Sequence, residues 1–270
     1  MFKLLRKFWV IATVAAFSFS GLTSCSDDDE PTPESGTTPE VEEKLFPHGR
    51  YLIRGFKDIG FNQDGTVKGI VWGDNPVTFE YLEQTTSDSP DVIMTFGSIL
   101  SHKIFLNDDG FVESMVEIYD DSVEANWEFK YNSDKQLNYL KRIDDEGANE
   151  IKFTYSDGDI VAIEGLRKGV AYASNKITYT NSTITSPRDN IGGFMYFTGI
   201  YIGGLIHLDL LYLAGLVGYP TKHLPVQTLM ISGDKEMTTD FDWTLNSSNL
   251  PIVIYIKSGG EVEEATILWL

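Results

Sequence analysis

Short runs of alternating apolar and polar residues fill the chain from Leu45 onward. Residues 67–72, 77–82 and 92–96 follow this pattern, and segments rich in Gly, Asn, Asp, Ser and Pro separate them. A period of two places every second side chain on the same face of a strand. The pattern therefore predicts short β-strands with one buried and one exposed face.

A repeat of 24 residues runs through the middle of the chain. Its first register holds Phe105, Phe129, Phe153 and Ile177, and the residues two positions on are Asn107, Tyr131, Tyr155 and Tyr179. Turn-forming residues follow, and an apolar strand is expected to resume after each turn, at Val112, Leu137, Ile160 and Ile184. Each unit is predicted to be one β-hairpin. A single hairpin cannot bury its own apolar face, so successive hairpins are expected to pair edge to edge.

The pattern changes at residues 191–219, where Asp209 is the only formally charged residue. One or two short apolar helices are predicted near residues 194–218, ended by Pro220, that plug the open side of a curled sheet. A transmembrane helix is the alternative for this segment. Strands are expected to return at residues 226–231, 241–245, 252–256 and 266–270.

These elements predict a mainly β protein, an antiparallel meander of hairpin repeats that curls into an open barrel. A sheet of more than about ten strands does not stay flat. The barrel is expected to form one domain over residues 45–270, because about 246 mature residues suffice for one large domain.

The N-terminal segment has a different character. A basic start (Lys3, Arg6, Lys7), an apolar stretch and small residues up to Ser24 predict a signal peptide over residues 1–24. The Leu-Thr-Ser-Cys stretch that ends in Cys25 resembles the lipobox of bacterial lipoproteins, in which the cysteine thiol is acylated. Cys25 is the only cysteine, so an acylated chain contains no disulfide.

Residues 25–44 are predicted to form an acidic, proline-bearing, disordered linker behind the lipid. The acidic run after Cys25 resembles the export signal that sends lipoproteins of Bacteroidota to the outer face of the outer membrane. A plain acidic linker that faces the periplasm is the alternative. Without residues 1–24, which carry three basic and no acidic groups, the formal charge falls from −19 to −22. Such a charge disfavours binding to nucleic acid.

No motif with a known catalytic mechanism occurs, so no catalytic residue, metal site or cofactor is predicted. The histidines His48, His102, His207 and His223 lack the spacing of metal ligands. Acidic turns such as residues 107–110 lack the EF-hand spacing, and turn formation explains them. A pair of carboxylates for glycoside hydrolysis cannot be selected from 40 acidic residues.

Two weaker signals concern the surface. Asp121-Ser122-Val123 resembles an O-glycosylation acceptor, with Ser122 as the modified residue. Sugar-stacking candidates are Trp72, Trp127, Trp243 and Trp269, although three of them lie on strands where the core face is expected. The terminal Leu268-Trp269-Leu270 is similar to the last strand of integral barrels, but a lipid anchor makes a spanning barrel redundant.

With the lipobox, the hairpin repeats, the segment 212–216 and the junction 222–226 together, the chain resembles a family of Bacteroidota lipoproteins. These proteins carry a domain of unknown function with a porin-like, open-barrel fold. The resemblance implies an outer-membrane-anchored barrel-like domain and supplies no catalytic residues.

The predicted function is therefore that of a surface-exposed outer-membrane lipoprotein, a non-enzymatic binding or structural component of the envelope. Its expected partners are the outer membrane, through the anchor, and a glycan or another envelope protein. The alternatives are a hydrolase that acts on extracellular polymer and an integral outer-membrane β-barrel.

Overall fold

The computed structural model describes residues 45–83, 86, 88–195 and 208–270. All of them lie in one compact unit, Ser35–Leu270. The elements in chain order are β1 (Tyr51–Leu52), β2 (Phe56–Phe61), β3 (Val67–Trp72), β4 (Asn75–Tyr81), β5 (Val92–Phe96), β6 (Leu100–Leu106), β7 (Val112–Tyr119), β8 (Ser122–Tyr131), β9 (Leu137–Asp144), β10 (Gly147–Ser156), β11 (Asp159–Arg167), β12 (Val170–Thr178), β13 (Arg188–Asp189), α2 (Leu208–Leu213), β14 (His223–Leu224), β15 (Gln227–Ser232), β16 (Lys235–Leu245), β17 (Pro251–Ser258), β18 (Glu261–Thr266) and β19 (Leu268–Trp269).

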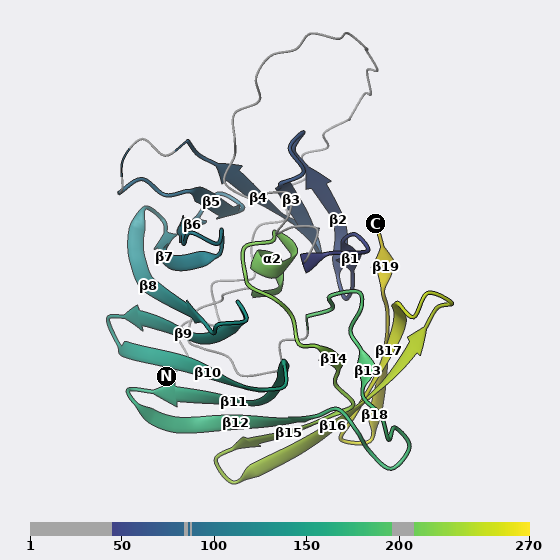
Figure 1. The fold of residues 1–270 in the computed structure, drawn as a ribbon. Coiled ribbons are helices and arrows are strands. Elements are labelled where there is room, and N and C mark those ends of the chain that lie inside the picture. The colour runs from purple at the N-terminus through teal and green to yellow at the C-terminus, as the bar shows by residue number, and fades with distance from the viewer. Residues whose placement is uncertain (1–44, 84–85, 87, 196–207) are drawn as a thin grey trace, which may run out of the picture. The chain divides into compact units, whose positions relative to one another are not determined.

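One antiparallel sheet of 15 strands forms the body of the unit, from β2 at one edge to β18 at the other (Figure 1). Strands adjacent in the sheet are adjacent in sequence except β12 and β15, which pair across residues 179–226. Among the described residues the edge strands do not pair with each other, so the barrel is open. A short β1–β19 ladder holds Tyr51 opposite Trp269. The predicted mainly β, open-barrel fold is confirmed.

The connections fall on two rims, because successive strands of a meander reverse direction. The turn rim carries the short connections 73–74, 97–99, 120–121, 145–146, 168–169, 233–234 and 259–260. The loop rim carries the connections 62–66, 82–91, 107–111, 132–136, 157–158 and 246–250 and the long insertion 179–226.

Four loops of the loop rim share one five-residue design, with asparagine first. They begin at Asn62, Asn107, Asn132 and Asn246. In each, the first N–H donates to the fifth carbonyl, and the fourth residue has a positive φ. In the last three, the Asn Oδ1 atom also accepts the N–H groups of the third and fifth residues at 2.9–3.0 Å. Asparagine suits this position because its side chain forms such local bonds readily.

The tyrosines of the 24-residue repeat have a second role besides core packing. Each hydroxyl donates to a carbonyl at the start of the preceding strand at 2.8–2.9 Å: Tyr131 to Val112, Tyr155 to Leu137 and Tyr179 to Ile160. The indole nitrogens of Trp243 and Trp269 donate to the carbonyls of Pro225, just before β15, and of Pro251, the first residue of β17. These aromatic residues therefore tie neighbouring strands together at the loop rim.

The segment that follows α2, residues 214–224, runs along the loop rim, and we call it the strap. Its backbone contacts come every third residue: Val112 donates to Leu216, Tyr219 donates to Lys135 and Lys222 donates to Gly158, at 2.9–3.0 Å. Three extended residues span about 10 Å, which matches the roughly 9.6 Å width of two strands. The strap therefore forms one backbone hydrogen bond with each successive hairpin, as the acceptor at the first and as the donor at the other two.

Helix α2 packs inside the curve of the sheet (Figure 1), and five of its six residues are buried. The helix ends at Leu213, and Gly215 in the turn after it has a φ of +82°, a conformation common just past a helix C-terminus. The predicted plug near residues 194–218 is thus present as one short helix among the described residues of that range. In the described part of the chain, no helix has the length and apolarity needed to cross a membrane.

The prediction that a strand resumes at Ile184 is wrong. Asn181 still begins a turn, because its Oδ1 atom accepts the N–H groups of Thr183 and Ile184. However, β12 finds its partner in β15 instead of in the residues that follow it. Ile184 is buried outside the sheet, so the fourth unit of the repeat is half a hairpin.

Candidate functional site

The two modification sites predicted from sequence are not brought together with any other candidate. Cys25 lies outside the described residues, so its lipidation stays a prediction. Ser122 is exposed as the first residue of β8, directly after the turn at Asp120 and Asp121. Its position leaves the hydroxyl accessible to a modifying enzyme, and its glycosylation also stays a prediction.

The histidines are dispersed. His48 is exposed, His102 is buried on β6, His223 lies in β14, and His207 is outside the described residues. No group of three or more metal-binding side chains occurs in the part of the chain that the structure covers.

The tryptophans are mainly structural. Trp127 and Trp243 are buried, whereas Trp72 and Trp269 are half-buried. Trp269 contacts the Tyr51 ring, with centroids 5.4 Å apart. An exposed sugar-stacking platform is therefore not formed by these four side chains.

The repeat forms three hairpins, the first from β6 and β7, the second from β8 and β9 and the third from β10 and β11. A first polar cluster fastens the strap to the third hairpin. The Asp159 carboxylate accepts bonds from the Thr221 hydroxyl at 3.0 Å, the His223 N–H at 2.8 Å and the His223 ring at 2.6 Å. The Tyr179 hydroxyl lies 2.8 Å from the Thr221 hydroxyl. Gln136 donates from the second hairpin to the carbonyls of Gly158 and Pro220, both at 3.0 Å.

The Asp159–His223 pair is the arrangement in this cluster that most resembles acid–base machinery. In nucleophilic catalysis, the base bonds to the nucleophile on one side and to its orienting carboxylate on the other. Here the Thr221 hydroxyl bonds to the carboxylate and not to the imidazole, and the far ring nitrogen faces Asp189 at 3.5 Å. The cluster therefore positions the strap.

A second polar region lies inside the barrel toward the turn rim. Near the loop rim most buried side chains of the strands are apolar, but farther along the strands several buried polar residues take their place. They are His102 on β6, Glu117 on β7, Arg142 on β9, Asn149 on β10 and Asn175 on β12.

Glu117 and Arg142 form the centre of this region. The Arg142 guanidinium donates to both Glu117 carboxylate oxygens, at 3.1 and 3.2 Å, and also pairs with Asp144. The Trp127 indole donates to Glu117 at 2.9 Å. Burial acts to lower the pKa of Arg142, but the bonds and charges of Glu117 and Asp144 outweigh it, so the pKa is raised. The guanidinium therefore stays charged and fixed.

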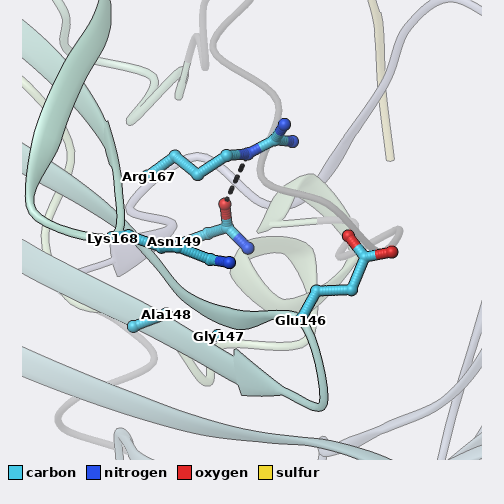
Figure 2. Close-up of a pocket in the computed structure, with 6 residues that line it drawn as sticks. All are labelled: Glu146, Gly147, Ala148, Asn149, Arg167 and Lys168. Carbon is cyan, nitrogen blue, oxygen red and sulfur yellow. Dashed lines mark hydrogen bonds between the residues drawn. The ribbon is translucent and has the colours of Figure 1, made fainter. Parts of the chain in front are cut away.

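A cavity of about 140 Å³ opens at the turn rim next to this network (Figure 2). Its lining residues come from the β9–β10 and β11–β12 turns and the strands beside them: Glu146, Gly147, Ala148, Asn149, Arg167 and Lys168. Asp144 links the two features, because its Oδ1 atom accepts the N–H groups of Glu146 and Gly147 at 2.9 and 3.1 Å. The ion-pair network thus fixes one wall of the cavity.

These residues were not among the sites predicted from the sequence. A signal was present: Glu117 follows buried Met115 by two positions, and Arg142 follows buried Leu140 by two. Extending the period-two pattern would have placed both charges on the inward face.

An open, mainly antiparallel barrel with an internal helix and a polar end defines the chain as a porin-like domain. The chain belongs to the family described as "Domain of unknown function (DUF4595) with porin-like fold", whose model matches residues 62–252. A search of curated proteins found no match.

Solved structures show the same fold. A porin-like protein from Bacteroides uniformis matches with a TM-score of 0.60 and 17% identity, covering 83% of this chain and 98% of that one. A porin-like protein from Bacteroides vulgatus matches with a TM-score of 0.52 and 11% identity, covering 82% and 98%. At these identities the comparison establishes the fold.

Proposed function

We propose that the protein is a non-enzymatic binding component of the outer membrane, anchored by a lipid on Cys25 and exposed at the cell surface. We further propose that it binds a glycan at the turn rim. The cavity beside Asp144 is the main support for a binding role. Its polar wall is held rigid by a buried ion-pair network. Binding sites gain affinity when their polar groups are fixed in advance.

The chemistry of the cavity suits hydroxyl-rich ligands. Asn149, Arg167 and Lys168 supply N–H donors, and Glu146 supplies carboxylate acceptors. Sugar hydroxyls both donate and accept, so they satisfy a mixed set of this kind. The volume of about 140 Å³ is below that of pockets for drug-sized molecules, and therefore suits one residue of a longer chain.

The outer wall of the barrel supports a tethered domain over the integral-barrel alternative. The outward side chains of β8 to β10 include Glu128 and Lys130, and the Lys130 ammonium lies 5.2 Å from the centre of the Tyr139 ring. The Tyr139 hydroxyl in turn donates to Glu150 at 3.0 Å. A charge on the lipid face of a membrane barrel costs about 2–4 kcal/mol at the bilayer midplane. These charged and polar side chains are those expected on a wall that faces water.

The anchor is tested by metabolic labelling with palmitate. We expect the full chain to incorporate label and a Cys25→Ser variant to lose it and to leave the membrane fraction. Digestion of intact cells with protease should degrade the wild-type protein, which reports its exposure at the surface. A Cys25→Ser variant that stays in the membrane would support the integral barrel, and protection from protease would support the periplasmic alternative.

The binding role is tested with the full chain in detergent micelles on an array of neutral and acidic bacterial glycans. We expect binding to a subset of them. Uniform silence of the array would refute the glycan assignment.

A further inference from the structure

The cavity at the turn rim concentrates positive charge in a strongly acidic protein. Arg167 and Lys168 both line it, and Glu146 is the carboxylate among its lining residues. The whole chain has a formal charge of −19. The lining therefore carries a net charge of one positive unit on a molecule that otherwise repels anions.

Asn149 orients the first cation. This residue is 7% exposed, and its Oδ1 atom accepts the Arg167 Nε–H at 3.2 Å. This bond uses the Nε atom of the guanidinium, and the two terminal nitrogens lie on the side away from Asn149, as Figure 2 shows. A guanidinium edge with two parallel N–H groups matches a carboxylate in a bidentate arrangement.

The backbone brings the second cation to the same opening. The Lys168 N–H donates to the Ala148 carbonyl at 2.7 Å, and Lys168 has a φ of +51° in the tight β11–β12 turn. The Lys168 side chain folds over Gly147, where an added Cβ atom would lie 2.9 Å from the lysine Cε atom. The absence of a side chain at Gly147 therefore lets the lysine stem pack against β10.

Glu146 restricts which anions fit. Its carboxylate shares the cavity with the two cations, so a dianion such as phosphate would meet one repulsive charge beside two attractive ones. A singly charged carboxylate balances the net charge of the lining. Hydroxyl groups next to that carboxylate would donate to Glu146, and a uronic acid carries both groups on one ring.

We propose that this cavity binds a uronic-acid residue of an acidic glycan, with the sugar carboxylate on Arg167 and Lys168 and a ring hydroxyl on Glu146. This inference rests on the glycan-binding function proposed above and specifies its ligand class. In this arrangement the Asn149 amide N–H, which lies on the side away from Arg167 (Figure 2), donates to the oxygen of a second hydroxyl on the sugar ring.

The test measures binding of the full chain to oligogalacturonate and to a neutral galactan of matched length by isothermal titration calorimetry. Wild type is compared with an Arg167→Gln, Lys168→Gln double variant. Lys235→Gln is the matched control, because Lys235 is an exposed lysine beside another turn of the same rim. Loss of charge-assisted hydrogen bonds should weaken uronate binding by roughly ten- to a hundredfold in the double variant. The control should bind as wild type does.

Glu146→Gln provides a second variant at an exposed position that has little effect on folding. It should raise the affinity for inorganic phosphate and lower the preference for uronate over phosphate. Circular dichroism of every variant reports that the fold is retained.

The outcomes separate the two proposals. Uronate binding that the double variant leaves unchanged, or equal binding of galactan, would overturn the uronate site while glycan binding itself stands. Stronger binding of phosphate or of a peptide with a free C-terminal carboxylate would also overturn it. Silence toward every saccharide would remove both proposals.

Discussion

Gly218 in the strap offers a sharp test of how the loop rim is held. Gly218 is buried, and an added Cβ atom would lie 1.9 Å from the Lys135 carbonyl oxygen and 3.0 Å from the Tyr131 ring. The first of these contacts is to backbone, which cannot rotate away. In Gly218→Ala the strap must therefore lift from the second hairpin, next to the bond from the Tyr219 N–H to the Lys135 carbonyl.

The size of the effect follows from two costs. Overpacking a tight site destabilises a protein by about 1–3 kcal/mol. Leaving the Tyr219 N–H and the Lys135 carbonyl without each other adds about 1–3 kcal/mol where water cannot replace the bond. We expect Gly218→Ala to lower the free energy of unfolding by roughly 2–6 kcal/mol, which lowers the Tm by roughly 4–24 °C for a domain of this size.

Thermal unfolding followed by circular dichroism measures this change. Gly60→Ala is the matched control, because the nearest atom to an added Cβ there is 4.0 Å away and the residue lies in edge strand β2. Hydrogen exchange of the Tyr219 amide should accelerate in Gly218→Ala more than exchange within the sheet does. Equal Tm values for the two variants would refute the packing argument.

Three further predictions concern the interior and the outer wall. Arg142→Met should lower stability by about 3–5 kcal/mol in urea unfolding, because it leaves the Glu117 carboxylate buried without its cation; an unchanged urea midpoint would contradict this. Tyr155→Phe should cost about 1 kcal/mol in the same assay, because it removes the donor to the Leu137 carbonyl, and a neutral result would reduce that bond to a packing contact. Burial first, and then the bond to Glu150, raise the pKa of Tyr139 to about 12 from 10.0. The folded state therefore favours the neutral form of Tyr139. The contribution of neutral Tyr139 to the free energy of unfolding is complete below pH 10 and is lost as the pH rises to 12. An absorbance titration of Tyr139→Phe should therefore lack one ionisation step near pH 12, and an identical curve would contradict the shift.

Much of the sheet could be predicted from sequence, because local signals specify hairpins. The period-two alternation gives most strands a buried face, and the Asn132 and Asn107 loops carry the turn residues that the geometry needs. The three hairpins from β6 to β11 follow both signals. Neither signal requires knowledge of distant residues, which is why it can be recognised without a structure.

The errors arise where distant contacts decide. Strand β18 is Glu-Val-Glu-Glu-Ala-Thr, and only Ala265 in it is buried, so an apolar alternation is missing at this sheet edge. At Ile184 the turn signal is present, but β15 supplies the partner for β12 from residues far along the chain. The strap could not be predicted from its own residues either. Its three-residue spacing of backbone bonds can be recognised only when it is compared with the width of the hairpins.

The site was missed for a related reason. A charged residue in a strand is expected to face water, and Glu117 and Arg142 violate this expectation together. Glu117 can be buried because its carboxylate pairs with Arg142. Arg142 can be buried because its guanidinium pairs with both Glu117 and Asp144. The pairing is between β7 and β9, which are not adjacent in the sheet, so no single strand reveals it.

The contrast between the rims gives these details a common cause. At the loop rim, the tyrosine hydroxyls, the strap amides and Asp159 bond to the backbone and to one another, so this end is committed to holding the sheet. The turn rim is closed by short turns that need few side chains. The inward positions near it are therefore not required to hold the sheet together. Polar residues can occupy these positions. The free-energy cost of burying the charges of Glu117 and Arg142 is offset by the ion pair between them. The ligand-binding role that we propose fits the turn rim for this reason, because Arg167 and Lys168 lie there.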